Sequence, residues 1–440
     1  RLFHVARGTV PIPQCRLFRG CGRAVGHAFG DDPCRKTPNV SDERFTGSFT
    51  QQEPIPEEGI AAAMAVMRSG RLHRYNLGPD EEGEAAALER EFAAAMGVPY
   101  CLAVASGGYA LACALRAIGV RAGEPVLTNA FTLAPVPGSI ASIGAVPVFV
   151  EVTQALTLDI DDVVVKAKAT GAKVLMLSHM RGHLCDMDRL MAVCNALGVK
   201  VIEDCAHTMG ARWNGRLSGT DGLIGCYSTQ TYKHMNSGEG GLLVTRDPEV
   251  MARAVMLSGS YMLYGKHTAS PGAEAFETVR YETPNVSGRM DHLRAAILRP
   301  QLRALEAQCE RWNERYRVVE AGVRGTPGLT VVERPAQEHY VGSSIQFLLL
   351  DWPGEKVREV LARCLARGVD MKWFGADEPV AFTSRYDSWH YVDAARMPKS
   401  DRILAGIVDM RLPLTFSLED CAQIAGIIRT EVGAVYQAKA

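Results

Sequence analysis

Short apolar runs alternate with amphipathic segments along the first part of the chain. The apolar runs predict buried strands at residues 100–105, 125–128, 146–150, 173–177, 199–203, 223–228 and 241–245. Apolar residues at helical spacing predict helices around residues 60–67, 88–96, 109–118, 135–142, 159–169 and 186–197. Gly70 and Gly97 follow the first two of these helices and are predicted to end them. Apolar strands separated by helices are typical of a mostly parallel sheet with both faces buried.

The pattern changes after Asp247, where the regular alternation weakens. A long helix is predicted from about Met290 to Val323. Smaller elements follow it, namely a strand at 344–350, a helix at 354–367, a strand at 368–373 and a closing helix at 417–436. We therefore predict an α/β fold with two domains, a large domain at residues 55–310 and a smaller C-terminal α+β domain at residues 311–440.

The N-terminal end differs in composition from the rest of the chain. The first thirty residues contain five arginines and no aspartate or glutamate. An arginine-rich leader without acids is typical of an organelle transit peptide, but a tag, a fragment end or translated upstream sequence fits the same residues. We expect residues 1–50 to be a poorly ordered extension, and the choice between cytoplasm and organelle stays open with it.

The charge balance and the cysteines exclude several classes of protein. The 440 residues include 48 basic and 49 acidic side chains, without the basic excess that binders of nucleic acid or anionic membranes show. The 12 cysteines stand singly, without a CxxC pair, which indicates reduced thiols in a cytoplasmic protein and argues against a disulfide scaffold or a zinc ribbon. No apolar run reaches the roughly 18 residues that a membrane span needs.

Three short segments could carry chemistry, and each follows a predicted strand. Ser106, Gly107 and Gly108 begin a helix, where backbone N–H groups and the helix dipole can hold a phosphate. Asp204 and Lys233 also follow strands, at the sheet edge where ligands gather. Each segment has an ordinary explanation as well: a tight turn, an aspartate that caps a helix, or a solvated lysine. Together, a phosphate cradle, an acid for a pyridinium nitrogen and a lysine nucleophile are what pyridoxal phosphate requires.

These segments belong to a longer series of motifs. The series comprises Ser106-Gly107-Gly108-Tyr109-Ala110-Leu111, Gly123-Glu124-Pro125-Val126, Gly144 through Val152, His179…Gly182…Asp186-Met187-Asp188, EDCAH at 203–207 and KHMNSGEGG at 233–241. In this series the chain resembles the DegT/StrS family of sugar aminotransferases, within the aspartate aminotransferase fold group (fold type I). The agreement is good over residues 56–310 and weaker beyond them. The resemblance implies a three-layer large domain, pyridoxal 5′-phosphate as cofactor, and a homodimer with shared active sites.

The resemblance also implies individual roles. Lys233 would hold the cofactor as a Schiff base and move the proton, while Asp204 would pair with the pyridinium nitrogen. His207 would lie near the phenolic oxygen of the ring and Ala206 against one ring face. The phosphate would be held by Ser106, Gly107, Gly108 and Ser228, and across the dimer by Arg289 or its neighbour Ser287.

Two regions depart from the family pattern. Where the family places Thr and then an aromatic residue over the cofactor ring, this chain has Thr132 followed by Leu133, with Phe131 before them. Either Phe131 or an aliphatic residue would then cover the ring. Residues 372–391 do not resemble the usual sugar-nucleotide region. Candidates for contact with substrate, each of which could equally be a solvated charge or a packed ring, are Arg74, Arg181, Lys372, Trp373 and Arg385.

The predicted reaction is a ping-pong transamination from glutamate or glutamine to a keto-sugar, a cyclitol or another small ketone or aldehyde. The alternatives are a dehydratase or lyase of the same family, in which His replaces the lysine, and a non-catalytic regulator that binds the cofactor. Lys233 argues against both, although His234 lies beside it. A metal site at His179, His183 and Asp186 is not expected, because these residues fall in a turn rather than on one helix face.

Overall fold

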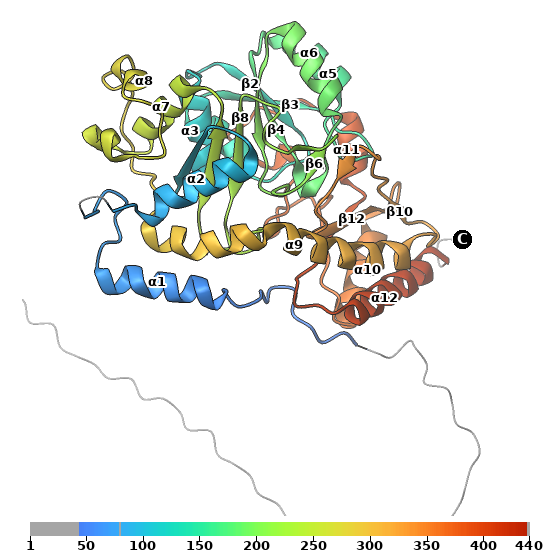
Figure 1. The fold of residues 1–440 in the computed structure, drawn as a ribbon. Coiled ribbons are helices and arrows are strands. Elements are labelled where there is room, and N and C mark those ends of the chain that lie inside the picture. Colours follow the sequence, from blue (N-terminus) through green and yellow to red (C-terminus); the bar gives the residue numbers. More distant parts are fainter. Residues whose placement is uncertain (1–43, 79–80, 438–440) are drawn as a thin grey trace, which may run out of the picture. The chain divides into compact units, whose positions relative to one another are not determined.

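A seven-stranded sheet lies at the centre of the computed structural model, which describes residues 44–78 and 81–437 (Figure 1). Its strands are β1 (Tyr100–Val104), β2 (Pro125–Asn129), β3 (Val146–Val150), β4 (Val174–Ser178), β5 (Lys200–Asp204), β8 (Ile224–Ser228) and β9 (Gly241–Thr245). Their spatial order is β1-β9-β8-β5-β4-β2-β3. β9 is antiparallel to both of its neighbours, and the other pairs are parallel. The seven strands confirm the strands expected from the apolar runs.

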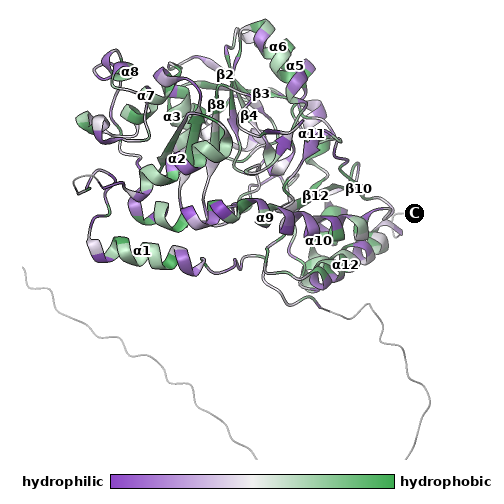
Figure 2. Ribbon diagram, in the orientation of Figure 1, coloured by the Kyte–Doolittle hydropathy of each residue, from purple (hydrophilic) through white to green (hydrophobic). Residues whose placement is uncertain are grey.

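Helices cover both faces of this sheet, so that this part of the chain has three layers. One face carries α3 (Gly107–Ala117), α4 (Pro135–Ser142) and α7 (Pro248–Leu257). The other carries α2 (Glu84–Met96), α5 (Ile160–Thr170), α6 (Met187–Leu197) and α9 (His292–Val323). Successive side chains of a strand point to opposite faces: Leu102 and Val104 pack with the first group, Cys101 and Ala103 with the second. Figure 2 shows the resulting concentration of hydrophobic residues in the central strands.

A smaller antiparallel sheet follows in the sequence. It consists of β10 (Thr330–Val331), β12 (Ser344–Leu348), β14 (Ile407–Arg411) and β13 (Lys372–Trp373), in that spatial order. α10 (Gly354–Ala366), α12 (Leu418–Gln437) and the second half of α9 share its apolar core. The remaining elements are α1 (Glu57–Ser69), β6 (Arg212–Trp213), β7 (Arg216–Leu217), η1 (Met180–Gly182), η2 (Tyr261–Lys266), α8 (Glu274–Glu277), β11 (Glu338–His339), η3 (Tyr386–Ser388) and α11 (Pro398–Leu404).

The helix α9 is shared between the two sheets. Its Leu298 packs under the large sheet, whereas Tyr316 and Val319 belong to the core of the small one. The boundary expected at 310/311 therefore falls inside a continuous helix, and the described residues form one compact unit. The expected helix ends at Gly70 and Gly97 are confirmed, since both glycines adopt left-handed backbone conformations (φ 70° and 64°).

The end of the expected N-terminal extension is packed rather than loose. Most of that extension, residues 1–43, lies outside the described residues. Phe45 and Phe49 are buried, and each ring packs edge-on against Phe416 with 5.0 Å between centroids. The expectation of poor order is therefore wrong for residues 44–50, because these two rings complete the core of the small sheet. Within the described part of the chain, no helix has the length and apolarity to cross a bilayer.

Candidate active site

Polar side chains from distant parts of the sequence meet at the carboxyl edge of the large sheet. Asp204 and Ser228 end β5 and β8, and Ser106 follows β1. Because these three strands run in the same direction, their carboxyl ends meet at one edge. A cavity of about 510 Å³ opens there. Its lining includes the predicted cofactor residues Ser106, Gly107, Gly108, Asp204, Ala206, His207, Ser228 and Lys233.

One end of the cavity is formed where α3 begins beside the end of β8. The Ser106 hydroxyl caps α3 by accepting the Tyr109 N–H (3.0 Å). Gly107 lies directly against Ser228, since a Cβ atom at Gly107 would be only 2.9 Å from the Ser228 Cβ. A Cβ at Gly108 would meet nothing nearer than 3.8 Å. The free N–H groups of the first turn, the helix dipole and the Ser228 hydroxyl make this end suitable for a phosphate.

Asp204 is held by a chain of hydrogen bonds at the floor of the cavity. Its Oδ2 accepts from the Ser178 hydroxyl (3.0 Å) and its Oδ1 from the Ala206 N–H (3.1 Å). Ser178 in turn accepts from the Thr132 hydroxyl (2.9 Å). Burial raises the pKa of Asp204, and these hydrogen bonds and Lys233 offset it only in part. No cationic side chain of the described residues lies within ion-pair distance of this carboxylate.

Lys233 enters the cavity beside His207. Its Nζ lies 2.8 Å from His207 Nε2, and the backbone N–H of Arg181 donates to His207 Nδ1 (3.4 Å). Burial, assisted by the Arg181 charge, lowers the pKa of Lys233 to about 7. Burial and the Lys233 charge lower the pKa of His207 well below its ordinary value. At neutral pH, a neutral imidazole therefore faces an amine of which a substantial fraction is neutral, as a nucleophilic lysine requires.

Two arginines form another part of the lining. Arg181 has a left-handed backbone (φ 55°), and its Nη2 lies 2.9 Å from Asp409 Oδ2. The guanidinium carbon of Arg411 lies 3.8 Å from the centre of the Tyr232 ring and 4.8 Å from that of Phe382. Arg181 packs over the same Phe382 ring at 4.7 Å.

Sequence reasoning identified Arg181 but missed Arg411, Phe382 and Tyr232 as lining residues. The apolar residues at 407, 408 and 410 could have predicted a strand, and a basic residue at the end of a strand beside the site would then have drawn attention to Arg411.

The remaining candidates for substrate contact lie away from the cavity lining and already have partners. The partners are Glu89 for Arg74 (2.8 Å), Asp370 for Lys372 (2.8 Å), the Ala405 carbonyl for Trp373 (2.9 Å) and Asp387 for Arg385 (2.9 Å). Of the five predicted substrate residues, all of which are described, the structure brings Arg181 alone to the cavity.

The residue at the expected ring-stacking position is aliphatic. Leu133 lines the cavity, whereas Phe131 is fully buried outside the lining and packs edge-on against Phe374 (5.0 Å between centroids). Arg289 is also outside the lining of this chain, and its guanidinium packs 5.5 Å from the Tyr261 ring centre.

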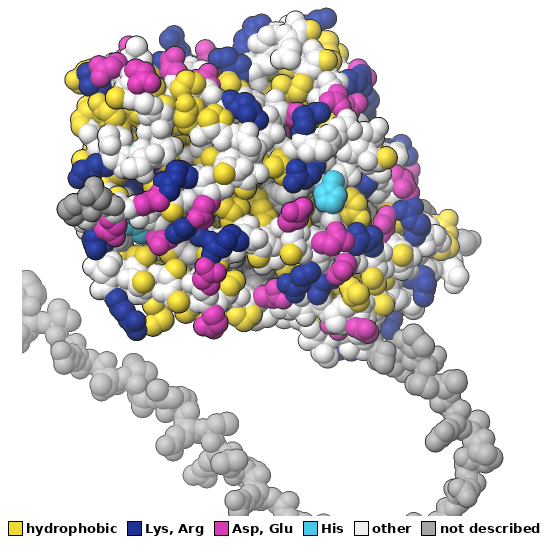
Figure 3. Space-filling view, viewed as in Figure 1, with side chains coloured by type: hydrophobic (Ala, Val, Ile, Leu, Met, Phe, Trp, Pro, Cys, Tyr) yellow, Lys and Arg dark blue, Asp and Glu magenta, His cyan; other side chains and the backbone are white. Residues whose placement is uncertain are grey.

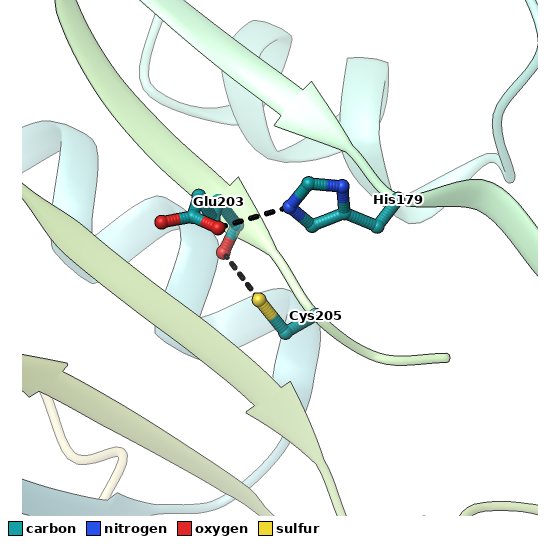
Figure 4. A group of neighbouring side chains, drawn as sticks. All are labelled: His179, Glu203 and Cys205. Carbon is teal, nitrogen blue, oxygen red and sulfur yellow. Dashed lines mark hydrogen bonds and ion pairs between the residues drawn. The ribbon is translucent and has the colours of Figure 1, made fainter. Parts of the chain in front are cut away.

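A cluster of possible metal ligands lies close to the site, at His179, Glu203 and Cys205 (Figure 4). Glu203 already accepts the N–H groups of Gly219 (2.8 Å) and Gly222 (2.6 Å), and it lies 2.9 Å from His179 Nε2. Burial raises the pKa of the Cys205 thiol well above its ordinary value. A protonated thiol beside a carboxylate that already accepts several hydrogen bonds is a poor donor set for a metal. Among the described residues, His179, His183 and Asp186 do not form such a cluster: His183 contacts Gln346, and Asp186 caps α6.

The cavity residues fit pyridoxal phosphate. The buried carboxylate of Asp204, without a cationic partner among the described residues, suits a protonated ring nitrogen. The close approach of Gly107 to Ser228 leaves a cradle that a side chain would fill. Lys233 supplies an amine with a lowered pKa.

Known proteins are similar to this chain in sequence and in fold. The sequence profile of the DegT/DnrJ/EryC1/StrS aminotransferase family matches residues 54–429. The dTDP-3-amino-3,4,6-trideoxy-alpha-D-glucose transaminase of Streptomyces venezuelae is 33% identical over 300 residues, 67% of this chain and 72% of the relative. The L-glutamine:2-deoxy-scyllo-inosose aminotransferase of Streptoalloteichus tenebrarius is 34% identical over 258 residues, 58% of this chain and 60% of the relative. The crystal structure of 3-amino-5-hydroxybenzoic acid synthase superposes with a TM-score of 0.75 at 26% identity, covering 88% of this chain and 99% of that one.

Proposed function

The chain belongs to the DegT/DnrJ/EryC1/StrS aminotransferase family of pyridoxal-phosphate enzymes, and we propose that it moves an amino group from glutamine or glutamate to a small ketone of the sugar or cyclitol class. The observation that carries this proposal is the Lys233 amine, whose pKa is lowered to about 7 in a cavity that also holds Asp204 and the start of α3. The relatives named for L-glutamine, 2-deoxy-scyllo-inosose and a dTDP-amino sugar support the donor and the acceptor class.

The residues that would hold the cofactor are divided between the two ends of the cavity. Ser106, Gly107, Gly108 and Ser228 would hold its phosphate, while Asp204 would accept a hydrogen bond from its ring nitrogen. When bound, pyridoxal phosphate supplies an electron sink that makes the carbon next to the amino group acidic. Thr132 and Ser178 orient the Asp204 carboxylate, so that its charge stays directed into the cavity.

Lys233 would move the proton during both halves of the reaction. A base with a pKa near the working pH combines a useful neutral fraction with sufficient proton affinity. His207, which is neutral and lies 2.8 Å from Lys233 Nζ, positions this amine. The amino donor and the carbonyl acceptor would occupy the same cavity in turn, as a ping-pong transamination requires.

The alternative reaction of the family receives no support from His234. Its Nε2 lies 3.1 Å from the Ser343 hydroxyl, and its ring packs edge-on against Trp312 (5.1 Å between centroids). It is not part of the 510 Å³ cavity lining. We therefore favour transamination over dehydration.

We also propose that two copies of the chain form a dimer. Tyr261, Met262 and Leu263 of η2 expose large apolar side chains, and the Tyr261 ring packs against Arg289. An exposed apolar patch beside a cation whose predicted role lies in the partner's site is what a shared active site needs.

The proposal is tested by the half-reaction with an amino donor. The holoenzyme is mixed with L-glutamine or L-glutamate, and the keto acid formed is quantified by mass spectrometry in a single turnover. We expect one equivalent of keto acid for each active site, and loss of this product in Lys233→Ala. Lys200→Ala, which removes an exposed lysine at the start of β5, is the matched control and is expected to retain the reaction. Keto acid formation by Lys233→Ala would remove Lys233 from its proposed role.

A further inference from the structure

A second cavity, of about 620 Å³, lies next to the turn η1. Arg181 of this turn lines the 510 Å³ cavity, whereas His183, which directly follows the turn, lines the second cavity. Other lining residues come from the start of α6, from β6 and from the segment that leads into β11, and α6 and β6 mark the place in Figure 1. The linings of the two cavities, as far as the described residues form them, have no residue in common.

Two buried side chains of the second cavity have an acceptor atom without a donor. The Gln346 amide nitrogen donates to Asp409 Oδ1 (2.7 Å), so the Gln346 oxygen faces His183 Nε2 (2.8 Å) and this ring nitrogen carries the proton. His183 Nδ1 is then an acceptor, and it has no hydrogen-bond partner among the described residues although His183 is only 4% exposed. The Glu338 side chain is 2% exposed; its Oε1 already accepts from Arg334 Nη1 (2.8 Å), while its Oε2 has no partner in the same part of the chain. Neither acceptor is sealed from solvent, so a ligand in the cavity can donate to both.

The charge of the lining favours a donor that is a cation. Its charged side chains are four carboxylates and two guanidinium groups, those of Asp186, Asp188, Glu333, Glu338, Arg189 and Arg334. Arg216 and Arg324 approach two of these carboxylates from outside the lining, but each is shared with a further carboxylate. Burial raises the pKa of Glu338 even though Arg334 lies beside it, so the charge of this carboxylate is incompletely compensated. Trp213 adds an aromatic ring to the lining, and this combination suits a hydroxylated ring that carries an ammonium group.

The turn between the two cavities has a strained backbone. Arg181 and Gly182 both have left-handed conformations (φ 55° and 83°), and a residue other than glycine keeps this conformation where its surroundings hold it. The Arg181 N–H donates to His207 Nδ1 (3.4 Å) in the 510 Å³ cavity. Arg334 Nη1, from the lining of the second cavity, donates to the Gly182 carbonyl (2.7 Å). The turn is therefore held by contacts from both cavities.

A buried chain of side chains joins the two cavities as well. His183 Nε2 lies 2.8 Å from the Gln346 oxygen, and the Gln346 amide donates to Asp409 (2.7 Å). The other oxygen of Asp409 lies 2.9 Å from Arg181 Nη2. Hydrogen bonds in such a chain strengthen one another. A ligand that donates to His183 Nδ1 therefore supports the position of Arg181.

We propose that the second cavity binds a hydroxylated ring amine, the chemical class that amination of a keto-sugar or cyclitol would form, and that this ligand tightens binding of the amino donor by holding η1 in place. The ligand class follows from the lining, and the link to the amino donor rests on the proposed function. The direction follows from the strain, because a donor that enters a cavity already ordered by the first ligand loses less conformational entropy.

D-glucosamine and D-glucose test the site, since they differ in one ammonium group. Their dissociation constants are measured by calorimetry on the full chain loaded with pyridoxal phosphate and reduced with borohydride, which fixes the cofactor to Lys233 so that the probe amine cannot react with it. We expect D-glucosamine to bind at least about tenfold more tightly than D-glucose, through charge-assisted hydrogen bonds. Cyclohexylamine, which has the charge without the hydroxyl groups, should bind less tightly than D-glucosamine.

Variants assign this binding to the second cavity. Ala155→Trp places an indole in the cavity from an exposed position and is expected to weaken D-glucosamine binding at least about tenfold. Gln154→Trp, at the exposed neighbour outside this lining, is the matched control and should leave it unchanged. Glu338→Gln keeps the shape and should remove most of the preference for D-glucosamine over D-glucose. Thermal unfolding and cofactor absorbance confirm that each variant is folded and loaded.

The effect on the amino donor is measured in the L-glutamine half-reaction of the unreduced holoenzyme. Saturating D-glucosamine is expected to lower the L-glutamine concentration for half-maximal rate about fivefold, and to have no such effect in Ala155→Trp. Competition for the 510 Å³ cavity would instead raise this concentration.

The outcomes separate this inference from the proposed function. Equal binding of the two sugars, binding of neither, or D-glucosamine binding that survives in Ala155→Trp overturns the site. A half-maximal concentration that stays the same or rises overturns the link to the donor. The proposed function fails by a different result, namely the absence of keto acid from every amino donor.

Discussion

Burial and the positive charges of Arg181 and Arg411 lower the pKa of Lys233 to about 7. The neutral amine is the nucleophile, and a lowered pKa increases its fraction at neutral pH. We expect the apoenzyme to capture pyridoxal phosphate covalently at a rate that rises between about pH 6 and 8 and then levels off. An ordinary lysine would continue to gain reactivity toward about pH 10. Stopped-flow absorbance measures the rate across this range.

The charge of Arg411 also predicts the direction in which the pH dependence of cofactor capture shifts when this charge is removed. Arg411→Gln removes a positive charge that disfavours the ammonium form of Lys233, so the midpoint should move to higher pH. Arg358→Gln should leave the midpoint in place, since Arg358 lies outside the cavity lining. A profile that rises steadily to pH 10 in the wild-type protein would contradict the lowered pKa.

Arg74 shows how a single residue can serve structure where its sequence suggested a substrate contact. Its guanidinium lies 2.8 Å from both Glu89 oxygens, and Glu89 also accepts the Ala103 N–H (2.7 Å) and lies 3.1 Å from His267 Nε2. Burial raises the pKa of Glu89, but Arg74 and His267 more than offset this and bring it to about 2. Because this pKa is below its ordinary 4.5, the stabilisation is present above pH 4.5 and is lost as the pH falls toward 2.

Removing Arg74 would leave the Glu89 charge buried with less compensation. We expect Arg74→Met to lower the free energy of unfolding by about 3–5 kcal/mol at neutral pH, measured with denaturant. The loss should shrink below about pH 4.5, because the unfolded chain then protonates Glu89 while the folded wild-type protein keeps it ionised down to about pH 2. Arg71→Met, which breaks an exposed ion pair with Glu81, should cost less than about 1 kcal/mol. Similar losses of unfolding free energy in the two variants would show that the buried ion pair of Arg74 and Glu89 stabilises the fold no more than an exposed one does.

Because the start of α3 lies against the end of β8, we expect alanine substitutions at two adjacent glycines to have opposite effects. A Cβ at Gly107 would press on Ser228, so Gly107→Ala should separate α3 from β8 and reduce the thermal stabilisation that added pyridoxal phosphate gives. Gly108 has open space around it and lies in the first turn of α3. Gly108→Ala should therefore keep that stabilisation, and it should gain about 0.5–1 kcal/mol in the apoenzyme because alanine favours the helix. Thermal unfolding with and without cofactor separates these effects, and equal losses in both variants would contradict them.

At the scale of elements, the sequence predicts the large sheet well because each of its strands is a short apolar run. The same pattern places Ser106, Asp204 and Lys233 at strand ends, and parallel topology then brings these ends together. The strand β14 was missed because its buried Asp409 interrupts the apolar pattern. That charge is buried because Gln346 and Arg181 contact it, and such long-range pairing leaves no local sequence signal. Arg411 was missed together with its strand.

At the scale of the whole molecule, the near-equal numbers of acidic and basic side chains correspond to a surface on which the two kinds are mixed. On the face shown in Figure 3, acidic and basic side chains are intermingled with apolar ones. The segment η2 presents three consecutive large apolar residues, Tyr261, Met262 and Leu263, in exposed positions. Its end is fixed by His267, which is buried against the ion pair of Arg74 and Glu89. The exposed residues are therefore supported at one end by a buried side chain, which suits an interface.

This support leads to a prediction about assembly. If two copies meet through η2, a charge at its most exposed residue should weaken the dimer, because the charge would lose water on association. We expect the wild-type holoenzyme to sediment as a dimer and Met262→Asp to shift toward monomer, with specific activity rising as the protein concentration is raised. Val165→Asp on α5 is the matched control, since Val165 is 60% exposed and Met262 59%. If Met262→Asp remains a fully active dimer at every concentration, η2 does not form the interface and Arg289 loses its predicted route to the partner's phosphate.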